Sequence, residues 1–168
     1  LSRRAAFPIC WLRLPGALVS AQGTAGAAAA AVIAAEAERI MAGEVRLFGT
    51  SFYAVGRVPE WNRCPLSGVL APAVHSNAIS LTDRAQVGDI KFVWELNRHL
   101  HWVSLAQAHA LGAGAQPLQV LGEQLRAWLQ QCPPDTGPHW TSPLEYALRL
   151  INWSAVWQLI DGQRCSPF

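Results

Sequence analysis

The sequence has little charge. Only 14% of its 168 residues are charged, and 13 basic against 11 acidic residues leave a formal net charge of +2. A nearly neutral chain with 51% hydrophobic residues can bury a sizeable core, which excludes a disordered tail. The low net charge also argues against nucleic acid as a partner, because nucleic-acid binders neutralise many phosphates with Lys and Arg. We therefore expect a single folded domain.

Paired cysteines are also missing. The four cysteines are far apart and form no Cys-x-x-Cys motif, which argues against a structural zinc site. They are Cys10, Cys64, Cys132 and Cys165. Free thiols are the simplest interpretation. A disulfide between two of them stays open, although a domain of this size does not need one.

The motifs of common cofactor sites are absent as well. There is no phosphate loop, no dinucleotide fingerprint and no Gly-x-Ser-x-Gly elbow. His99 and His101 are two residues apart, so they point in different directions on a helix and do not form a metal site. We expect no metal and no cofactor. His101 and His139 are the best placed histidines for proton transfer, but neither is assigned a catalytic role.

No apolar run is long and uninterrupted enough to span a bilayer. Residues 1–23 show no sustained periodicity, and we predict an irregular N-terminal segment there. Ser2-Arg-Arg followed by apolar residues faintly resembles an export signal, but Pro8, Arg13 and Pro15 interrupt its apolar centre. The pattern therefore argues against a signal peptide.

Helical periodicity dominates the remaining part, residues 24–168. We predict helices over residues 24–41, from 89 or 92 to 111, from 117 to the Pro133-Pro134 stop, and 142–160. The last has a capping-box signature, with Ser142 as N-cap, Pro143 in the first position and Glu145. Short connections make neighbouring helices antiparallel. The prediction is an all-α domain of antiparallel helical hairpins, with a short strand or extended arm at 44–53 and a long loop at 56–86.

Two of these helices carry a polar stripe. The stripe of the segment that begins near Asp89 comprises Trp94, Asn97, Arg98 and His101. The stripe of the last helix comprises Glu145, Arg149 and Asn152, at i, i+4 and i+7. The last helix is apolar on its other sides, so we expect it to be largely buried. Polar groups in such a place need partners or a ligand.

Uncommon motifs follow one another across these segments. They are Gly88-Asp-Ile-Lys, Trp94-Glu-Leu-Asn-Arg-His, Pro133-Pro, His139-Trp-Thr-Ser-Pro-Leu-Glu, Ala147-Leu-Arg and Asn152-Trp. In this order they resemble the N-terminal helical domain of the heparinase II/III-like polysaccharide lyases, over residues 36–161. Trp61 and Pro65 match a Trp-x-x-Asp-Pro segment of that family. Cys64 and Cys132 depart from the Asp and the Asn expected near them.

The resemblance implies part of an incomplete (α/α) toroid whose inner helices line a substrate cleft. These lyases are periplasmic or secreted and cleave uronic-acid-containing glycans, such as glycosaminoglycans, by β-elimination. In that reaction the sugar carboxylate is neutralised, a base removes the adjacent proton and an acid assists the leaving oxygen. The family's catalytic segment follows the matched region, so we expect no catalytic residue here and no activity without the C-terminal remainder. The glycan itself and the location of this chain stay open.

An acidic sugar requires a guanidinium fork, amide groups and flat aromatic faces, and the two stripes with Trp140 supply all three. The predicted substrate-binding residues are Trp94, Asn97, Arg98, His101, Trp140, Glu145, Arg149 and Asn152. Trp140, on a loop ahead of a helix, is the best candidate for sugar stacking. Core packing is the preferred interpretation for Trp94 and Trp153.

The competing interpretation is a non-catalytic helical scaffold or interaction domain. In it, Glu145 serves the capping box or Arg149, and Arg98 bridges helices through Glu95 or Glu145. The two interpretations differ in geometry. Convergence of the polar groups on an open groove favours sugar binding, and their mutual saturation in the interior favours a scaffold.

Overall fold

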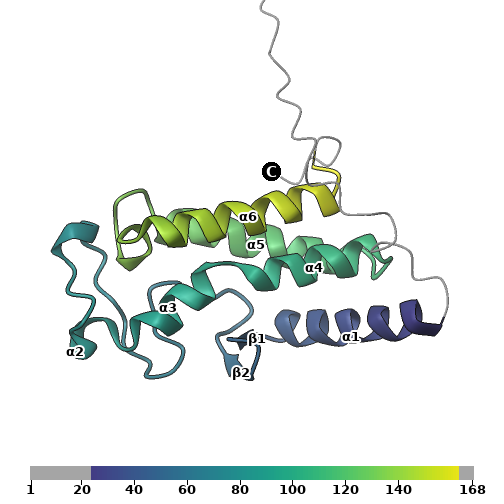
Figure 1. Cartoon of the computed structure of the whole chain (residues 1–168), viewed down its shortest axis with the longest axis horizontal. Coiled ribbons are helices and arrows are strands. Elements are labelled where there is room, and N and C mark those ends of the chain that lie inside the picture. Colours follow the sequence, from purple (N-terminus) through teal and green to yellow (C-terminus); the bar gives the residue numbers. More distant parts are fainter. Residues whose placement is uncertain (1–23, 163–168) are drawn as a thin grey trace, which may run out of the picture.

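The computed structural model describes residues 24–162 and is mostly helical (Figure 1). Its elements are α1 (Thr24–Met41), β1 (Glu44–Leu47), β2 (Ser51–Ala54), η2 (Ser76–Ala78), α2 (Arg84–Val87), α3 (Ile90–Asn97), α4 (Leu100–Ala110), α5 (Gln116–Gln131), η3 (Pro138–Trp140) and α6 (Pro143–Leu159). The predicted irregular segment, with its faint export-signal pattern, lies outside the described residues. Within residues 24–162, no helix is both long and apolar enough to cross a membrane.

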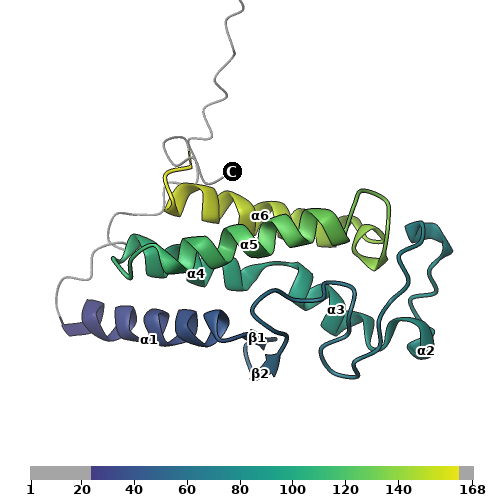
Figure 2. The same cartoon turned by 180° about the vertical axis from the view of Figure 1, so that it is seen from behind.

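Helix α4 lies at the centre of the molecule. It packs against α1 on one side and against α5 and α6 on the other, as Figures 1 and 2 show from opposite directions. The chain reverses direction from α4 to α5 and again from α5 to α6. The mostly helical structure and these two reversals agree with the predicted antiparallel helical hairpins.

The main hydrophobic core lies between these helices and the small sheet. Its largest fully buried side chains include Ile40, Leu47, Trp61, Leu96, Trp102, Leu105 and Leu121. Trp61 comes from the long loop, and its backbone N–H donates to the side chain of Gln131 at 2.9 Å. The buried indole and this backbone hydrogen bond therefore fasten the loop to the helices. Burial of so large a ring stabilises the fold by about 2–3 kcal/mol.

Residues 44–54 form a hairpin, where the sequence predicted only one short strand or an arm. Strands β1 and β2 pair antiparallel, with Glu44 opposite Ala54 and Leu47 opposite Ser51. Phe48 and Gly49 have φ angles of 53° and 68° and reverse the chain. The alternating pattern therefore spans two strands, because the turn falls in its middle.

The predicted single helix over residues 89–111 is wrong, because the chain breaks into α3 and α4. His99 lies between them with a left-handed backbone, at φ 61° and ψ 29°. Its ring is buried and stacks on Trp102 at a centroid distance of 3.7 Å, while Trp153 Nε1 donates to His99 Nδ1 at 3.0 Å. Left-handed backbone costs about 1–2 kcal/mol in a residue with a side chain. The ring contacts and the hydrogen bond offset that cost.

Helix α6 begins where the sequence placed it, with Ser142 as N-cap and Pro143 as the first helical residue. The capping box itself is not formed, since the Ser142 side chain makes no cap hydrogen bond and the Glu145 carboxylate binds Arg98. The expectation that α6 is largely buried is also wrong. Leu150 and Ile151 are 62% and 57% exposed, because neighbouring helices cover only one side of α6.

The two cysteines that the structure describes are both free and buried. Burial raises the pKa of the Cys132 thiol to about 12, so it stays protonated at neutral pH. Cys10 and Cys165 lie outside the described residues.

Gly43, between α1 and β1, lies close to the backbone of Gly56, and a substitution can test this close approach. Its φ is 94°, and a Cβ added there would lie 2.8 Å from the carbonyl carbon of Gly56. We expect Gly43→Ala to lower the free energy of unfolding by about 2–4 kcal/mol, because both backbone strain and a backbone clash result. Urea denaturation followed by circular dichroism measures this loss.

Gly49→Ala is the matched control. Gly49 also has a positive φ, of 68°, but a Cβ added there would have nothing within 4 Å. It should therefore lose only about 1 kcal/mol from strain. Equal losses in the two variants would contradict the close approach of Gly43 to Gly56.

Candidate functional site

Three of the predicted polar residues, Arg98, Glu145 and Asn152, meet where α3, α4 and α6 join. Arg98 Nε and Nη2 donate to the two carboxylate oxygens of Glu145 at 2.8 and 2.9 Å. Its Nη1 donates to Glu95, and its carbonyl oxygen accepts from Asn152 Nδ2 at 2.8 Å. We call these four residues the Arg98 centre. The bridge between helices that the scaffold interpretation predicted is present.

The Arg98 centre contains more negative than positive charge. The Glu145 side chain is 4% exposed and that of Arg98 is 27% exposed. The hydrogen bond to Glu145 is the main reason that the pKa of Arg98 lies above its ordinary value. Because Glu95 also contacts the guanidinium, an incoming sugar carboxylate would meet a cation that is already neutralised.

Asn97 lies behind this centre and is buried. Its Nδ2 donates to the carbonyl oxygens of Trp61 at 2.9 Å and Val93 at 2.8 Å. Its Oδ1 accepts from Trp128 Nε1 at 2.9 Å. The amide thus joins the long loop to α3 and α5, and all of these contacts are internal.

Arg149, one turn after Glu145 on α6, is a buried cation among aromatic rings. Its Nη2 donates to the carbonyl oxygen of His139 at 2.8 Å. Its Cζ lies 5.1 Å from the ring centroid of Trp128 and 5.2 Å from that of Trp140, distances typical of cation–π contacts. Burial lowers the pKa of Arg149 below its ordinary value, yet a guanidinium stays charged at neutral pH. The charge is therefore stabilised by rings and a carbonyl rather than by an ion pair.

His99, His101 and His139 are all buried. His101 Nε2 lies 3.1 Å from Gln124 Oε1, and His139 Nε2 lies 2.7 Å from Asn62 Oδ1. Burial lowers the pKa of His101 to about 4 and that of His139 to about 3, and it also holds the pKa of His99 well below the usual range. All three imidazoles are therefore neutral at physiological pH and face the interior.

Trp94 and Trp140, the two tryptophans among the predicted substrate-binding residues, are only partly covered. Trp94 is half-buried, and its Nε1 donates to the carbonyl oxygen of Pro138 at 2.9 Å, which holds η3 against α3. Trp140 is also half-buried, but its Nε1 is buried without a hydrogen-bond partner. Its carbonyl oxygen accepts from the Tyr146 hydroxyl. Trp140 therefore leaves part of its ring at the surface and anchors the remainder.

Of the eight predicted residues, Arg98, Glu145 and Asn152 belong to the Arg98 centre. Trp94, Trp140 and Arg149 lie on α3, η3 and α6, and Asn97 lies behind the centre. His101 is separate, because the break at His99 turns it away from the stripe and toward Trp61, on which it stacks at 6.1 Å. Of the set, Arg98, Asn152, Trp94 and Trp140 keep partial exposure. These four are the ones placed to touch a ligand.

Sequence reasoning missed three amides that complete the polar network, Asn62, Gln124 and Gln131. Gln124 is buried, and its Oε1 accepts from both Trp102 Nε1 at 2.8 Å and His101. The sequence did contain a signal for Gln124, because it follows Val120 by four residues on the buried side of α5. An amide at a core position of an amphipathic helix indicates a buried hydrogen-bond network.

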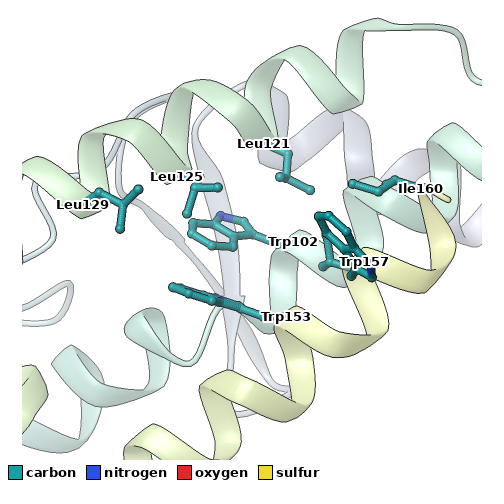
Figure 3. A pocket seen from close by; sticks show the side chains of 8 residues that line it. Trp102, Leu121, Leu125, Leu129, Trp153, Trp157 and Ile160 are labelled. Carbon is teal, nitrogen blue, oxygen red and sulfur yellow. The ribbon is translucent and has the colours of Figure 1, made fainter. Parts of the chain in front are cut away.

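A separate apolar groove lies between α5 and α6 (Figure 3). It has a volume of about 260 Å³ and is lined by Trp102, Leu121, Leu125, Leu129, Trp153, Val156, Trp157 and Ile160. None of the eight predicted residues lines this groove. The Arg98 centre and this apolar groove therefore lie at different places on the molecule.

Within the part of the chain that the structure describes, no group of three or more His, Cys, Asp or Glu side chains could hold a metal ion. Comparison of the chain with protein-family models, with curated proteins and with solved structures finds no match.

Substitution of Glu145 tests whether the Arg98 centre stabilises the fold. We expect Glu145→Gln to lower the free energy of unfolding by about 1–3 kcal/mol, because a buried charged hydrogen bond to Arg98 is lost. Glu44→Gln is the matched control, since Glu44 accepts from Arg39 Nε at the same 2.8 Å but its side chain is 42% exposed. That change should cost less than about 1 kcal/mol. Equal effects in chemical denaturation would argue against a stabilising role for the centre.

The buried histidines make stability depend on pH. The unfolded chain protonates histidine near pH 6.5, whereas the folded chain keeps His101 neutral until about pH 4. Between these values the unfolded state binds more protons, so the free energy of unfolding falls as the pH falls. Each such histidine should contribute a loss of about 1.4 kcal/mol per pH unit. Urea denaturation at several pH values between roughly 7.5 and 4.5 would measure the slope of the free energy of unfolding against pH.

His101→Phe should make that slope shallower, because the ring is kept and the titrating group is lost. Gln119→Ala, a change at an exposed residue of α5 that removes no histidine, should leave the slope unchanged. A slope that is the same in the wild type and in His101→Phe would refute the assignment.

Proposed function

We propose that the chain is an N-terminal helical framework domain of a heparinase II/III-like polysaccharide lyase, and that it forms part of the wall of an incomplete (α/α) toroid. One observation carries the proposal. The residues that carry the family resemblance, among them Arg98, Glu145 and Asn152, converge in the structure on one contact between α3, α4 and α6. Residues that hold the wall of a cleft in place are expected to bind one another across helices in this way.

In β-elimination on a uronic acid, one group neutralises the carboxylate, another removes the adjacent proton and a third assists the leaving oxygen. The Arg98 centre is poorly suited to the first role, because its guanidinium already has two carboxylate partners. The buried neutral imidazoles of His101 and His139 are poorly suited to the second. The proposed role of this chain is therefore to hold the wall of the cleft in place, while catalytic groups lie on the remainder of the lyase.

Direct contact with the glycan falls to the partly exposed side chains in this proposal. Trp94 and Trp140 offer ring faces to a sugar, and Asn152 has an amide oxygen in addition to the Nδ2 that binds Arg98. These groups suit sugar faces and hydroxyls better than a carboxylate. Glycans of heparan, alginate and bacterial exopolysaccharide type all fit this proposal, since all of them present sugar faces and hydroxyls.

A free-standing scaffold or interaction domain is the second candidate. The observation that favours it is the saturation of Asn97, Glu145 and Arg149 by internal partners. In this alternative the polar network only braces the helices, and the exposed apolar side of α6 meets a protein. Retention of glycan by the chain separates the two candidates.

The experiment compares stability and glycan retention in the same variants. We expect weak retention on immobilised alginate or heparan sulfate, no unsaturated product, and a loss of retention in Trp94→Ala and Asn152→Ala. Arg98→Ala should lower the free energy of unfolding by about 2–4 kcal/mol, and with Glu145→Ala the two losses should be non-additive by about 1–3 kcal/mol.

Neutral dextran is the control matrix, and Gln119→Ala on α5 is the control variant for retention. If the wild type binds alginate and heparan sulfate no better than dextran, the framework role in a lyase is not supported and the scaffold candidate stands. If Arg98→Ala leaves stability unchanged and abolishes retention, Arg98 binds the glycan and the bracing role is wrong.

A further inference from the structure

Side chains of α3 and α6 bind the backbone carbonyl oxygens of all three residues of η3. The three donors and their acceptors are Trp94 Nε1 to Pro138 at 2.9 Å, Arg149 Nη2 to His139 at 2.8 Å, and the Tyr146 hydroxyl to Trp140. A helix of a single turn has few hydrogen bonds of its own, so contacts of this kind decide how it lies. The segment that carries Trp140 is therefore fixed from two sides.

Arg149 makes two kinds of contact at this place. Besides its hydrogen bond to His139, its Cζ lies 5.1 Å from the ring centroid of Trp128 and 5.2 Å from that of Trp140. Trp128 is itself fixed, because it is 2% exposed and its Nε1 donates to Asn97 Oδ1 at 2.9 Å. A planar guanidinium can lie against ring faces in a way that an ammonium group cannot. Arg149 therefore couples the half-buried ring of Trp140 to the buried ring of Trp128.

The indole of Trp140 is held with its nitrogen inward. Nε1 is buried and has no hydrogen-bond partner, although the residue is partly exposed. An N–H group in that place loses the hydrogen bond that water would give it, so other contacts have to stabilise the orientation of the ring. Because Nε1 is the only polar atom of an indole, the exposed part of the ring is hydrocarbon. A ligand that meets it must offer C–H groups, as the apolar face of a pyranose does.

We propose that Arg149 positions Trp140, so that the indole forms a preformed platform on which the apolar face of a pyranose stacks. This inference rests on the function proposed above and deepens it, because it separates the residue that touches the sugar from the residue that holds it. Arg149 is 4% exposed, so it acts through the ring and not by contact with the ligand. A ring that is already held in its bound orientation loses little freedom when a sugar binds, which favours affinity.

Fluorine NMR of the 168-residue chain labelled with fluorotryptophan tests the positioning without any glycan. Trp140→Phe identifies the signal of Trp140. We expect Arg149→Met to move that signal toward the position of the free amino acid and to make it more sensitive to deuterated water, because the ring turns its N–H to solvent. Arg149→Lys should move it in the same direction, since this variant keeps the charge but not the planar group.

Retention on immobilised alginate or heparan sulfate supplies the second measurement. Arg149→Lys should weaken retention by about threefold to tenfold although Trp140 is still present, because the ring is no longer held for stacking. Trp140→Phe should weaken retention at least as much. Arg57→Met is the matched control, since Arg57 pairs with Glu123 at the surface at 3.0 Å. It should leave both the Trp140 signal and retention unchanged.

A Trp140 signal at its wild-type position in Arg149→Lys would overturn the proposal. Wild-type retention by a folded Arg149→Lys whose Trp140 signal has moved would overturn it as well. If Arg149→Met does not fold, as the other tryptophan signals reveal, Arg149→Lys decides by the same two criteria. A wild type that neither glycan retains would contradict the proposed framework role in a lyase instead, and the fluorine signals would still decide whether Arg149 holds the ring.

Discussion

The bidentate pair between Arg98 and Glu145 sets the geometry of the helical array. It joins the end of α3 to the first turn of α6, two segments 47 residues apart in the sequence. Glu145 is nearly buried, so its charge is tolerated only where a guanidinium meets it with good geometry. The pair therefore fixes how α6 lies on the helices before it, and with it the outer side of α6 and the α5–α6 groove.

Around this pair the interior is unusually rich in rings and amides. His99 stacks on Trp102, Arg149 lies among tryptophan rings, and the amide of Asn97 joins three segments. Buried hydrogen bonds of this kind favour one arrangement of helices, because another arrangement would leave more buried donors and acceptors unpaired. Among the described residues, Trp61 Nε1, His99 Nε2, His139 Nδ1 and Trp140 Nε1 are buried without a partner. Such a network supports the framework role that we propose.

The structure separates two surfaces that the sequence could not distinguish. The partly exposed side chains near the Arg98 centre are polar or aromatic, and they are the groups that we propose for contact with a glycan. The outer side of α6 is apolar and uncharged. The framework role that we propose uses the first of these surfaces.

The positions of α1, α5 and α6 could be predicted from the sequence, because apolar periodicity, proline and the Ser142 N-cap act within a few residues of one another. The pairing of Arg98 with Glu95 or Glu145 was also among the predictions, as one of two alternatives. The simultaneous pairing of Arg98 with Glu95 and Glu145, the break at His99 and the exposure of Leu150 all required the folded structure. A left-handed histidine is stable because Trp102 and Trp153 hold its ring, and those contacts exist only when distant segments fold together.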